Sequence, residues 1–579
     1  MSDVTDSLFA TRPIRTILLF VLLAAGARFV PAPWWEGNLL GVEPELPDPS
    51  GSFVAAPEAN ESVKQKLAKV ELGGAEKAES PTDDQEDQQA ESAEPTPAKA
   101  DSDPSGQPTG PDEKPDPEPE PTFVREASAD PDDLALLESM RRLDHKLDEP
   151  PVELQRPCLD YYPGYLTDSY RPICRRRALD PLFDQLREVA LKSADRPARF
   201  TQLGDSLIAG DAFTGELRRL MGEQFGDGGF GYVHAGRASA HIHTRHLSTD
   251  TSSDWRVHEV IHDPHDDVKF GLAGVAFEAR GAPTLGVSPH AEGHGRSFDR
   301  LGMLYYRKNR RVDLRVAVDG KSRRVDLSGP PGTNAIHWMK VERGTHDLRV
   351  SGFDRSAYFY GFLLENSGPG VVVDNLGLSN GRAPRLNYVD ARQWQKQIEM
   401  RRPDALSFAY GVNSAGEHKA SDRWLDEYAD QYTELLETAR QASDETGCMV
   451  MSLLTRAGKE DGEVVVYSSV EPLVRHQREA ARRANCAFWN AYRAMGGEDG
   501  AEQWYDNRPR LLGSDLAHPT GAGYKKLANL FYTALIREFR RYLDERIRRS
   551  TIPELREDDV SKESILSLRT ALSPAQRAN

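Results

Sequence analysis

Strand-like and helix-like patterns alternate from about residue 182 onward, and this alternation restricts the possible fold more than any other feature of the chain. Apolar runs typical of strands lie at residues 199–203, 405–410, 448–454 and 486–492. Amphipathic patterns typical of helices begin near residue 212, span 424–442 and 470–483, and begin again at Gly521. Strands that alternate with helices predict an α/β fold with a doubly wound parallel sheet, in which ligands bind at the carboxyl ends of the strands.

A second pattern interrupts this alternation between about residues 232 and 361, where no convincing helix is found. Short alternating runs, separated by Asp-Gly, Gly-Pro-Pro-Gly and Arg-Gly-Thr turns, predict strands at 311–318, 323–327, 336–341, 347–350 and 358–364. We therefore expect a β-sandwich inserted into the α/β domain.

The negative charge of the chain is concentrated ahead of the α/β region. The formal net charge is -18, and residues 43–122 alone hold 21 acidic and 6 basic side chains. This segment is rich in Pro, Glu, Asp, Ser and Ala and has no aromatic residue between Phe53 and Phe123, so we expect a disordered tether. The rest of the chain is close to neutral, which argues against a nucleic-acid-binding surface.

An apolar run precedes the tether. Residues 16–27 carry no charge, Arg12 and Arg15 come before them, and Trp34 and Trp35 follow. This arrangement predicts an uncleaved signal anchor that starts in the cytoplasm. The alternative is a cleaved signal peptide, because residues 25–27 resemble a small-residue cleavage site. Under either interpretation, the folded part of the chain is exported.

The four cysteines agree with export. Cys158 and Cys174 flank a polar, tyrosine-rich stretch, and we expect a disulfide between them. Cys448 and Cys486 each open a strand-like run, so they are either bridged neighbours or separate small buried residues. Their spacing does not match a zinc finger.

Four short blocks contain the residue types that acyl transfer requires. They occupy residues 204–207 (Gly-Asp-Ser-Leu), 377–381, 411–413 and 515–518. Ser206 follows the first predicted strand and precedes a helix, Asn413 follows a later strand, and Asp515 lies three residues before His518. Each block alone is explained as a helix cap or a turn. The four blocks together, in this order and at strand ends, favour a Ser-His-Asp site.

These blocks resemble those of the GDSL/SGNH hydrolases, a family with a flavodoxin-like three-layer fold. Within the family the chain is similar to peptidoglycan O-acetylesterases whose catalytic domain carries an inserted β-sandwich resembling carbohydrate-binding modules. The resemblance covers about residues 180–542. It rests in detail on the sequences at 203–206, 210–211, 216–219 and 225–229.

The resemblance implies a role for each site residue. Ser206 would be the nucleophile, His518 the base and Asp515 its orienting carboxylate. The Ser206 N–H, the Gly381 N–H and the Asn413 amide would form the oxyanion hole, with Gly377 as a second glycine candidate. The block at Asn413 departs from the family pattern, because Ser414 stands where the family has Asp. No metal or organic cofactor is implied.

Two other groups of residues suggest binding. Nine histidines crowd the region 234–294, and His241 and His243 are spaced for a metal on a strand face. The polar surroundings favour a loop instead. Several aromatic residues of the insert suit either stacking on sugar rings or core packing, with core packing expected for most of them: Tyr305, Tyr306, Trp338, Tyr358 and Tyr360.

We therefore predict a monomeric serine esterase that removes O-acetyl groups from an acetylated envelope polysaccharide, with peptidoglycan as the leading substrate. The alternatives are an inactive hydrolase-like carbohydrate-binding scaffold and an O-acyltransferase that uses the same serine. The predicted location is the cell envelope, with a single-pass inner-membrane anchor and a periplasmic or extracellular catalytic domain, or secretion after signal cleavage. The predicted organisation is an anchor (1–36), a tether (37–130), a discontinuous hydrolase domain (131–231 and 362–549), an insert (232–361) and a tail (550–579).

Overall fold

The computed structural model describes residues 129–144, 147, 173–262, 267–416 and 420–551. The predicted anchor, Cys158, and nearly all of the predicted tether and tail lie outside these residues. Within the described ranges, none of the helices combines the length and the hydropathy needed to span a membrane.

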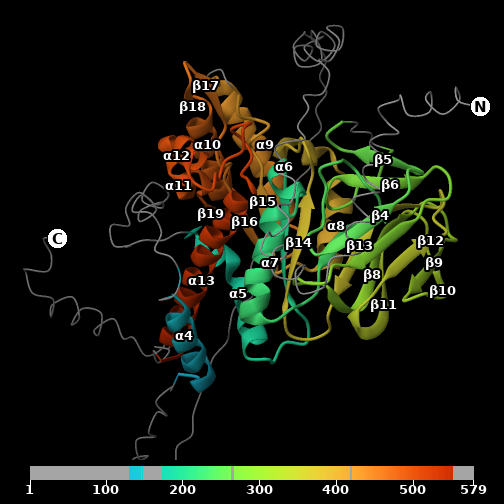
Figure 1. Ribbon diagram of the computed structural model, residues 1–579. Helices are drawn as coiled ribbons and strands as arrows, with labels where there is room; N and C mark the ends of the chain where they lie inside the picture. Colours follow the sequence, from blue (N-terminus) through green and yellow to red (C-terminus); the bar gives the residue numbers. More distant parts are fainter. Residues whose placement is uncertain (1–128, 145–146, 148–172, 263–266, 417–419, 552–579) are drawn as a thin grey trace, which may run out of the picture. The chain divides into compact units, whose positions relative to one another are not determined.

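A six-stranded sheet forms the centre of the α/β part, in the order β1-β19-β16-β15-β2-β14 (Figure 1). Its strands are β1 (Ile173–Cys174), β2 (Ala198–Gly204), β14 (Val371–Gly377), β15 (Ala405–Ala409), β16 (Gly447–Met451) and β19 (Ala487–Trp489). Neighbouring strands from β14 to β19 are parallel, whereas β1 pairs with β19 antiparallel. The sheet is therefore mixed. The prediction of a parallel sheet did not include β1, the antiparallel strand at its edge.

The strand order reverses at β2, because the next strand, β14, lies on one side of β2 and β15 lies on the other. In open α/β sheets such a reversal opens a crevice at the carboxyl ends of the strands. The register aligns the ends of three strands there, since Gly204 lies opposite both Gly377 and Ala409.

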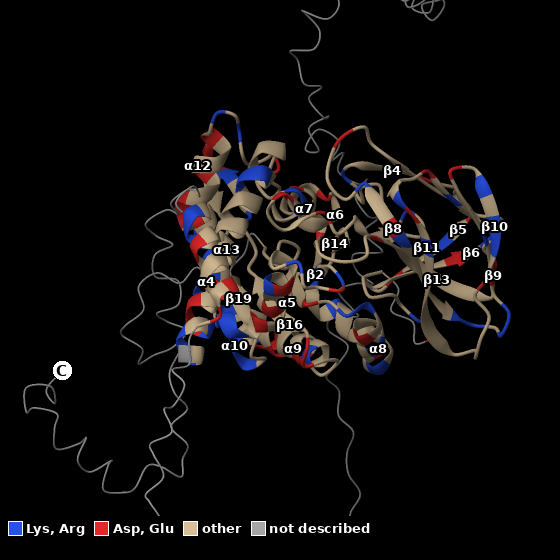
Figure 2. Cartoon of the chain, turned by 90° about the horizontal axis from the view of Figure 1, so that it is seen from below, with Lys and Arg blue, Asp and Glu red and all other residues tan. Residues whose placement is uncertain are grey.

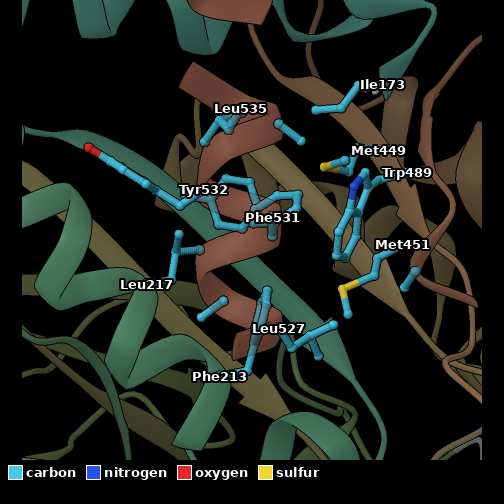
Figure 3. Close-up of a cluster of buried hydrophobic side chains, with 14 of the residues drawn as sticks. Ile173, Phe213, Leu217, Met449, Met451, Trp489, Leu527, Phe531, Tyr532 and Leu535 are labelled. Carbon is cyan, nitrogen blue, oxygen red and sulfur yellow. The ribbon is translucent and has the colours of Figure 1, made fainter. Parts of the chain in front are cut away.

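Helices cover both faces of the sheet, and the helices on each face pack in a separate apolar cluster. One face carries α5 (Asp180–Ala190), α7 (Ala212–Phe225) and α13 (Gly521–Thr551), and the other carries α8 (Ala391–Arg401), α9 (Asp422–Arg440) and α10 (Val470–Arg483). Figure 3 shows α13 with Phe531 facing Trp489 of β19, and their ring centroids are 5.1 Å apart. The helix α4 (Pro131–Asp144) is tied to α13 through the ion pair of Asp144 with Arg537.

Most predicted elements of this part are confirmed within a few residues. The run at 486–492 is a shorter strand than predicted, because Asn490 caps the next helix, α11 (Ala491–Met495), by accepting from the Arg493 N–H. The predictions did not include β14 and α8. Further short elements are α12 (Gly500–Asp506), β17 (Ala457–Glu460) and β18 (Glu463–Val466).

Two antiparallel sheets lie between β3 (Gly231–His234) and β14 in the chain. One contains β4 (Leu247–Thr251), β7 (Leu285–Pro289), β9 (Asp313–Val318), β10 (Lys321–Asp326) and β12 (Leu348–Ser351). The other contains β5 (Trp255–Glu259), β6 (Val275–Ala279), β8 (Ser297–Arg307), β11 (Thr333–Thr345) and β13 (Ala357–Glu365), with β3 paired to β13. Side chains of both sheets share one apolar cluster, for example Val316 of β9 and Phe359 of β13.

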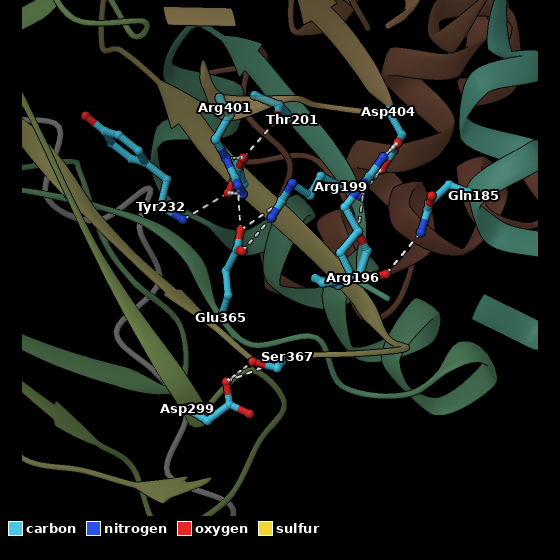
Figure 4. Close-up of polar contacts among 12 residues, drawn as sticks. Gln185, Arg196, Arg199, Thr201, Tyr232, Asp299, Glu365, Ser367, Arg401 and Asp404 are labelled. Carbon is cyan, nitrogen blue, oxygen red and sulfur yellow. Dashed lines mark hydrogen bonds and ion pairs between the residues drawn. The ribbon is translucent and has the colours of Figure 1, made fainter. Parts of the chain in front are cut away.

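A buried ionic network joins this region to the α/β sheet (Figure 4). Glu365, at the end of β13, accepts from Arg199 of β2 and from Arg401 of α8. Arg401 also donates to both carboxylate oxygens of Asp374 on β14, at 2.8 Å each. Asp374 in turn accepts from the Tyr232 N–H of β3 at 3.0 Å. Two cations and two anions thus balance one another out of contact with water.

One further sequence expectation can be compared with the structure. Cys448 and Cys486 form a disulfide that links β16 to the residue before β19. Of the two alternatives for these cysteines, the bridged pair is therefore confirmed. Figure 2 shows acidic and basic side chains together on the α/β part, with more acidic ones on α9 and more basic ones on α10 and α13.

Candidate active site

The predicted nucleophile lies where β2 ends. Asp205 caps the short helix α6 (Ser206–Ala209) by accepting from the Leu207 N–H at 3.0 Å, so Ser206 is the first helical residue. Gly204 permits this tight turn, because a Cβ there would lie 2.4 Å from Ile208 Cγ1 and 2.8 Å from the Ala409 carbonyl oxygen. The serine is therefore held at the carboxyl edge of the sheet, beside the strand reversal.

Three predicted site residues come together in one hydrogen-bonded chain. Ser206 Oγ lies 2.8 Å from His518 Nε2, and His518 Nδ1 lies 2.6 Å from Asp515 Oδ2. These contacts join residues 312 positions apart in the sequence. A base within hydrogen-bond reach of a serine, with a carboxylate on its other nitrogen, is the arrangement that activates a nucleophile.

The loop that carries His518 is folded around the Asp515 carboxylate. Asp515 Oδ1 accepts from the backbone N–H groups of Ala517 and His518 at 3.2 and 3.1 Å, and Leu516 takes a left-handed φ of 54°. Burial favours the neutral acid, but the hydrogen bonds from the His518 ring and from the two backbone groups outweigh it and lower the pKa of Asp515. The carboxylate is consequently charged at neutral pH and able to fix the imidazole.

Asn413 lies beside the block at 377–381. Its Nδ2 donates to the Gly381 carbonyl oxygen at 3.1 Å, which brings the ends of β14 and β15 together. The predicted Gly381 donor has a different partner in this structure, since the Gly381 N–H donates to the Leu378 carbonyl at 2.9 Å. The second glycine candidate is also engaged, because the Gly377 N–H donates to Asn375 Oδ1 at 2.9 Å.

Gly377 instead serves close packing, since a Cβ there would lie 2.3 Å from the Ala209 N atom. Within the turn after β14, the N–H of Asn380 makes no hydrogen bond to a described residue. Asn380 has a φ of 61°, a conformation that asparagine tolerates. Asn380 is thus a further candidate donor that the sequence analysis missed, although its Asn-Gly sequence marks such a turn.

Asp205 is a fully buried carboxyl group next to the nucleophile. Burial raises its pKa to about 6, against the lowering effects of the Leu207 N–H and of His518. Buried Tyr410 and Tyr428 lie close enough for the Asp205 charge to contribute to their raised pKa values, although burial is the main cause. The expected cap role is therefore present, and the carboxyl group that performs it is fully buried.

The histidine-rich segment lies against the site. The His243 N–H donates to the Ala209 carbonyl of α6 at 3.1 Å, and Ser239 Oγ lies 3.1 Å from Ser379 Oγ. Over the described ranges of the chain, no three or more His, Cys, Asp or Glu side chains are grouped to hold a metal ion. Tyr305, Tyr358 and Tyr360 are buried, as expected for core packing, while Trp338 is partly exposed with the Arg300 guanidinium 4.2 Å from its ring centroid.

Comparison with known proteins identifies the domain type. Residues 343–526 match the model of the GDSL-like Lipase/Acylhydrolase family, a range that contains Asn413, Asp515 and His518 and begins after Ser206. No curated protein matches the chain. Among solved structures, one described as "Peptidoglycan O-acetylesterase in action, 5 min" is 19% identical, with a TM-score of 0.50, and the match covers 64% of this chain and 96% of that one.

Two other solved structures overlap with smaller parts of the chain. An acetylxylan esterase from Geobacillus stearothermophilus is 19% identical over 29% of this chain and 73% of that one, with a TM-score of 0.22. A putative GDSL-like lipase from Parabacteroides merdae is 18% identical over 29% and 73%, also with a TM-score of 0.22.

Proposed function

We propose that the chain, whose GDSL-like acylhydrolase domain makes it a carboxylic ester hydrolase, removes O-acetyl groups from peptidoglycan by using Ser206, His518 and Asp515. The hydrogen-bonded chain of these three residues carries the proposal. The choice of substrate is supported by the fold likeness to the peptidoglycan O-acetylesterase, which extends over nearly all of that protein.

The proposed reaction has two steps. His518 Nε2 takes the proton of Ser206 Oγ while the oxygen attacks the ester carbonyl, and the sugar alcohol then leaves with that proton. Water attacks the resulting acetyl-serine by the same route, and acetate and free serine are formed. Asp515 holds the imidazole in the tautomer that accepts at Nε2, because its carboxylate binds the Nδ1–H.

The oxyanion of each tetrahedral intermediate needs preorganised donors. We assign the Asn413 amide and the Ser206 N–H to this role, as expected from the sequence, and replace the Gly381 N–H by that of Asn380. The Gly381 N–H would have to give up its bond to Leu378 before it could contribute.

The remaining parts of the proposal concern organisation and location. The two sheets between β3 and β14 are proposed to be the inserted carbohydrate-binding sandwich, which would hold the polymer beside Ser206. The apolar run at 16–27 is proposed as the membrane anchor of an exported enzyme. The Cys448–Cys486 disulfide is consistent with an oxidising compartment.

Acetate release from O-acetylated peptidoglycan by the full chain tests the proposal. Wild-type protein should release free acetate, and Ser206→Ala should release none while retaining the wild-type melting temperature. Acetyl groups found on a second sugar instead of in solution would identify a transferase. Failure to release acetate from the polymer and from 4-nitrophenyl acetate would refute the esterase proposal.

A further inference from the structure

Arg456 lies between two loops of the proposed active site and has no part in the proposed mechanism. Its guanidinium Nη1 donates to the Val412 carbonyl at 2.6 Å, directly before Asn413. The side chain is partly exposed, and its guanidinium has no other partner among the described residues. Its backbone carbonyl accepts from the Tyr467 N–H, at the far end of the β17–β18 hairpin, at 2.9 Å. Arg456 thus joins this hairpin to the loop that carries the Asn413 amide.

The same hairpin is bonded to the loop of the proposed base. Ala457, the first residue of β17, donates its N–H to the Leu516 carbonyl at 3.0 Å. Leu516 lies between Asp515 and His518. The chain at residues 456–457 therefore contacts the base loop through its backbone and the oxyanion loop through its side chain.

The Asn413 loop is a single turn with an anion at its start. The N–H groups of residues 414–415 both donate to the Gly411 carbonyl, at 2.9 and 3.0 Å, which closes the turn. At the start of the turn, hydrogen bonds from the N–H groups of Gly411 and Val412 to the Asp205 carboxylate oppose the rise that burial causes in its pKa. The peptide dipoles of such a turn favour an anion at the first N–H groups and a cation at the last carbonyl groups.

Arg456 supplies the cation at the end of this turn. The Val412 carbonyl belongs to the planar peptide group that leads into Asn413, so holding this oxygen also holds the Asn413 backbone. The Asn413 amide has two N–H groups, and its bond to the Gly381 carbonyl at 3.1 Å uses one and leaves the other for an oxyanion. An oxyanion donor is effective only where its direction is fixed before the reaction.

We propose that Arg456 is the positioning residue of the oxyanion hole: its guanidinium fixes the Val412 carbonyl, and thereby the direction of the Asn413 amide. The inference rests on the proposed function and extends it to a residue that is not one of the reacting groups. Loss of one oxyanion donor costs about 10²–10³ in kcat. A displaced donor should cost a part of this, about 10- to 100-fold.

Kinetics of Arg456→Met, which keeps a long side chain without its donors, tests the role. The kcat for acetate release should fall about 10- to 100-fold on both O-acetylated peptidoglycan and 4-nitrophenyl acetate, with KM little changed. Arg456→Lys retains a cationic donor and should recover most of the loss. Wild-type kcat in Arg456→Met would overturn the inference.

Arg440→Met is the matched control. Arg440 is also a partly exposed arginine that donates to a backbone carbonyl, that of Ala484 at 2.9 Å. This bond lies at the opposite edge of the sheet from the site, since α9 and α10 end there and β16 and β19 begin. The control should show a similar change of melting temperature with wild-type kcat. An equal fall of kcat in both variants would contradict a positioning role.

A double-mutant cycle separates positioning from general destabilisation. If Arg456 acts through Asn413, the double variant Asn413→Ala/Arg456→Met should have the kcat of Asn413→Ala alone. Losses of kcat that multiply would show that the two side chains act independently, and would overturn the inference.

Hydrogen exchange of the full-length protein, followed by mass spectrometry, gives a readout that does not depend on activity. The N–H groups of residues 411–415 should exchange about tenfold faster in Arg456→Met than in wild type or Arg440→Met, because the turn loses its anchor. Unchanged exchange there would overturn the inference while acetate release by wild type still supports the proposed function. If wild type releases no acetate from either substrate but exchange depends on Arg456, the proposed function fails and the positioning of this loop stands.

Discussion

Replacing Glu365 by Gln should destabilise the protein strongly, because the exchange removes one of the two anions of the buried ionic network. Glu365 is 0% exposed and accepts from two buried arginines, Arg199 and Arg401. Gln keeps the size of the side chain but leaves these two cations with Asp374 as their remaining buried anion. Breaking a buried ion pair by removing one charge typically costs roughly 3–5 kcal/mol.

The lowered pKa of Glu365 gives a similar value for the free energy that this side chain contributes to folding. Burial opposes ionisation, but the charges of Arg401 and Arg199 outweigh it and lower the pKa from 4.5 to about 2. A lowering of that size corresponds to about 3 kcal/mol of folded-state stabilisation at neutral pH. Because the folded-state pKa is the lower one, this stabilisation is complete above about pH 4.5 and is lost as the pH falls toward 2.

Urea unfolding at pH 7, followed by tryptophan fluorescence, measures the effect. Glu342→Gln is the matched control, because Glu342 is an exposed glutamate of β11. We expect the free energy of unfolding to fall by roughly 3–5 kcal/mol in Glu365→Gln and by less than about 0.5 kcal/mol in the control. The two variants should converge as the pH approaches 2. Equal stability of both variants at pH 7 would refute the assigned contribution of the network.

Three further outcomes are expected. Asp515→Asn should lower kcat for acetate release by about 10⁴ with little change in stability, because the imidazole loses the partner that fixes its tautomer, and a normal kcat would refute that role. Asn413→Ala should lower kcat by about 10²–10³ on both polymer and 4-nitrophenyl acetate, since oxyanion stabilisation does not depend on the leaving group; a loss on the polymer alone would point to substrate binding instead. Cys448→Ser should lower the free energy of unfolding by about 4 kcal/mol relative to oxidised wild type, the value of the chain-entropy model for a separation of 38 residues. In dithiothreitol the wild type and the variant should have the same free energy of unfolding.

The α/β part was largely predictable because its signals are local. Buried parallel strands such as 405–409 read as continuous apolar runs, and α10 shows its apolar face in the sequence. The strand β14 was not predicted: Gly368, Pro369 and Gly370 precede it and the strand ends in a glycine, which are signals of a turn. β1 is only two residues long and has no periodicity to detect.

The sequence by itself determined which chemical groups are present and at which ends of strands they occur, since motif spacing and strand position are properties of the chain. Ser206, Asn413, Asp515 and His518 were all named from it. Only the tertiary structure decided which of these groups meet and which are already engaged. The contact between Ser206 and His518 spans 312 positions, and the bond that occupies the Gly381 N–H depends on the conformation of one turn. Contacts between residues far apart in the sequence are set by long-range packing, and no local pattern encodes them.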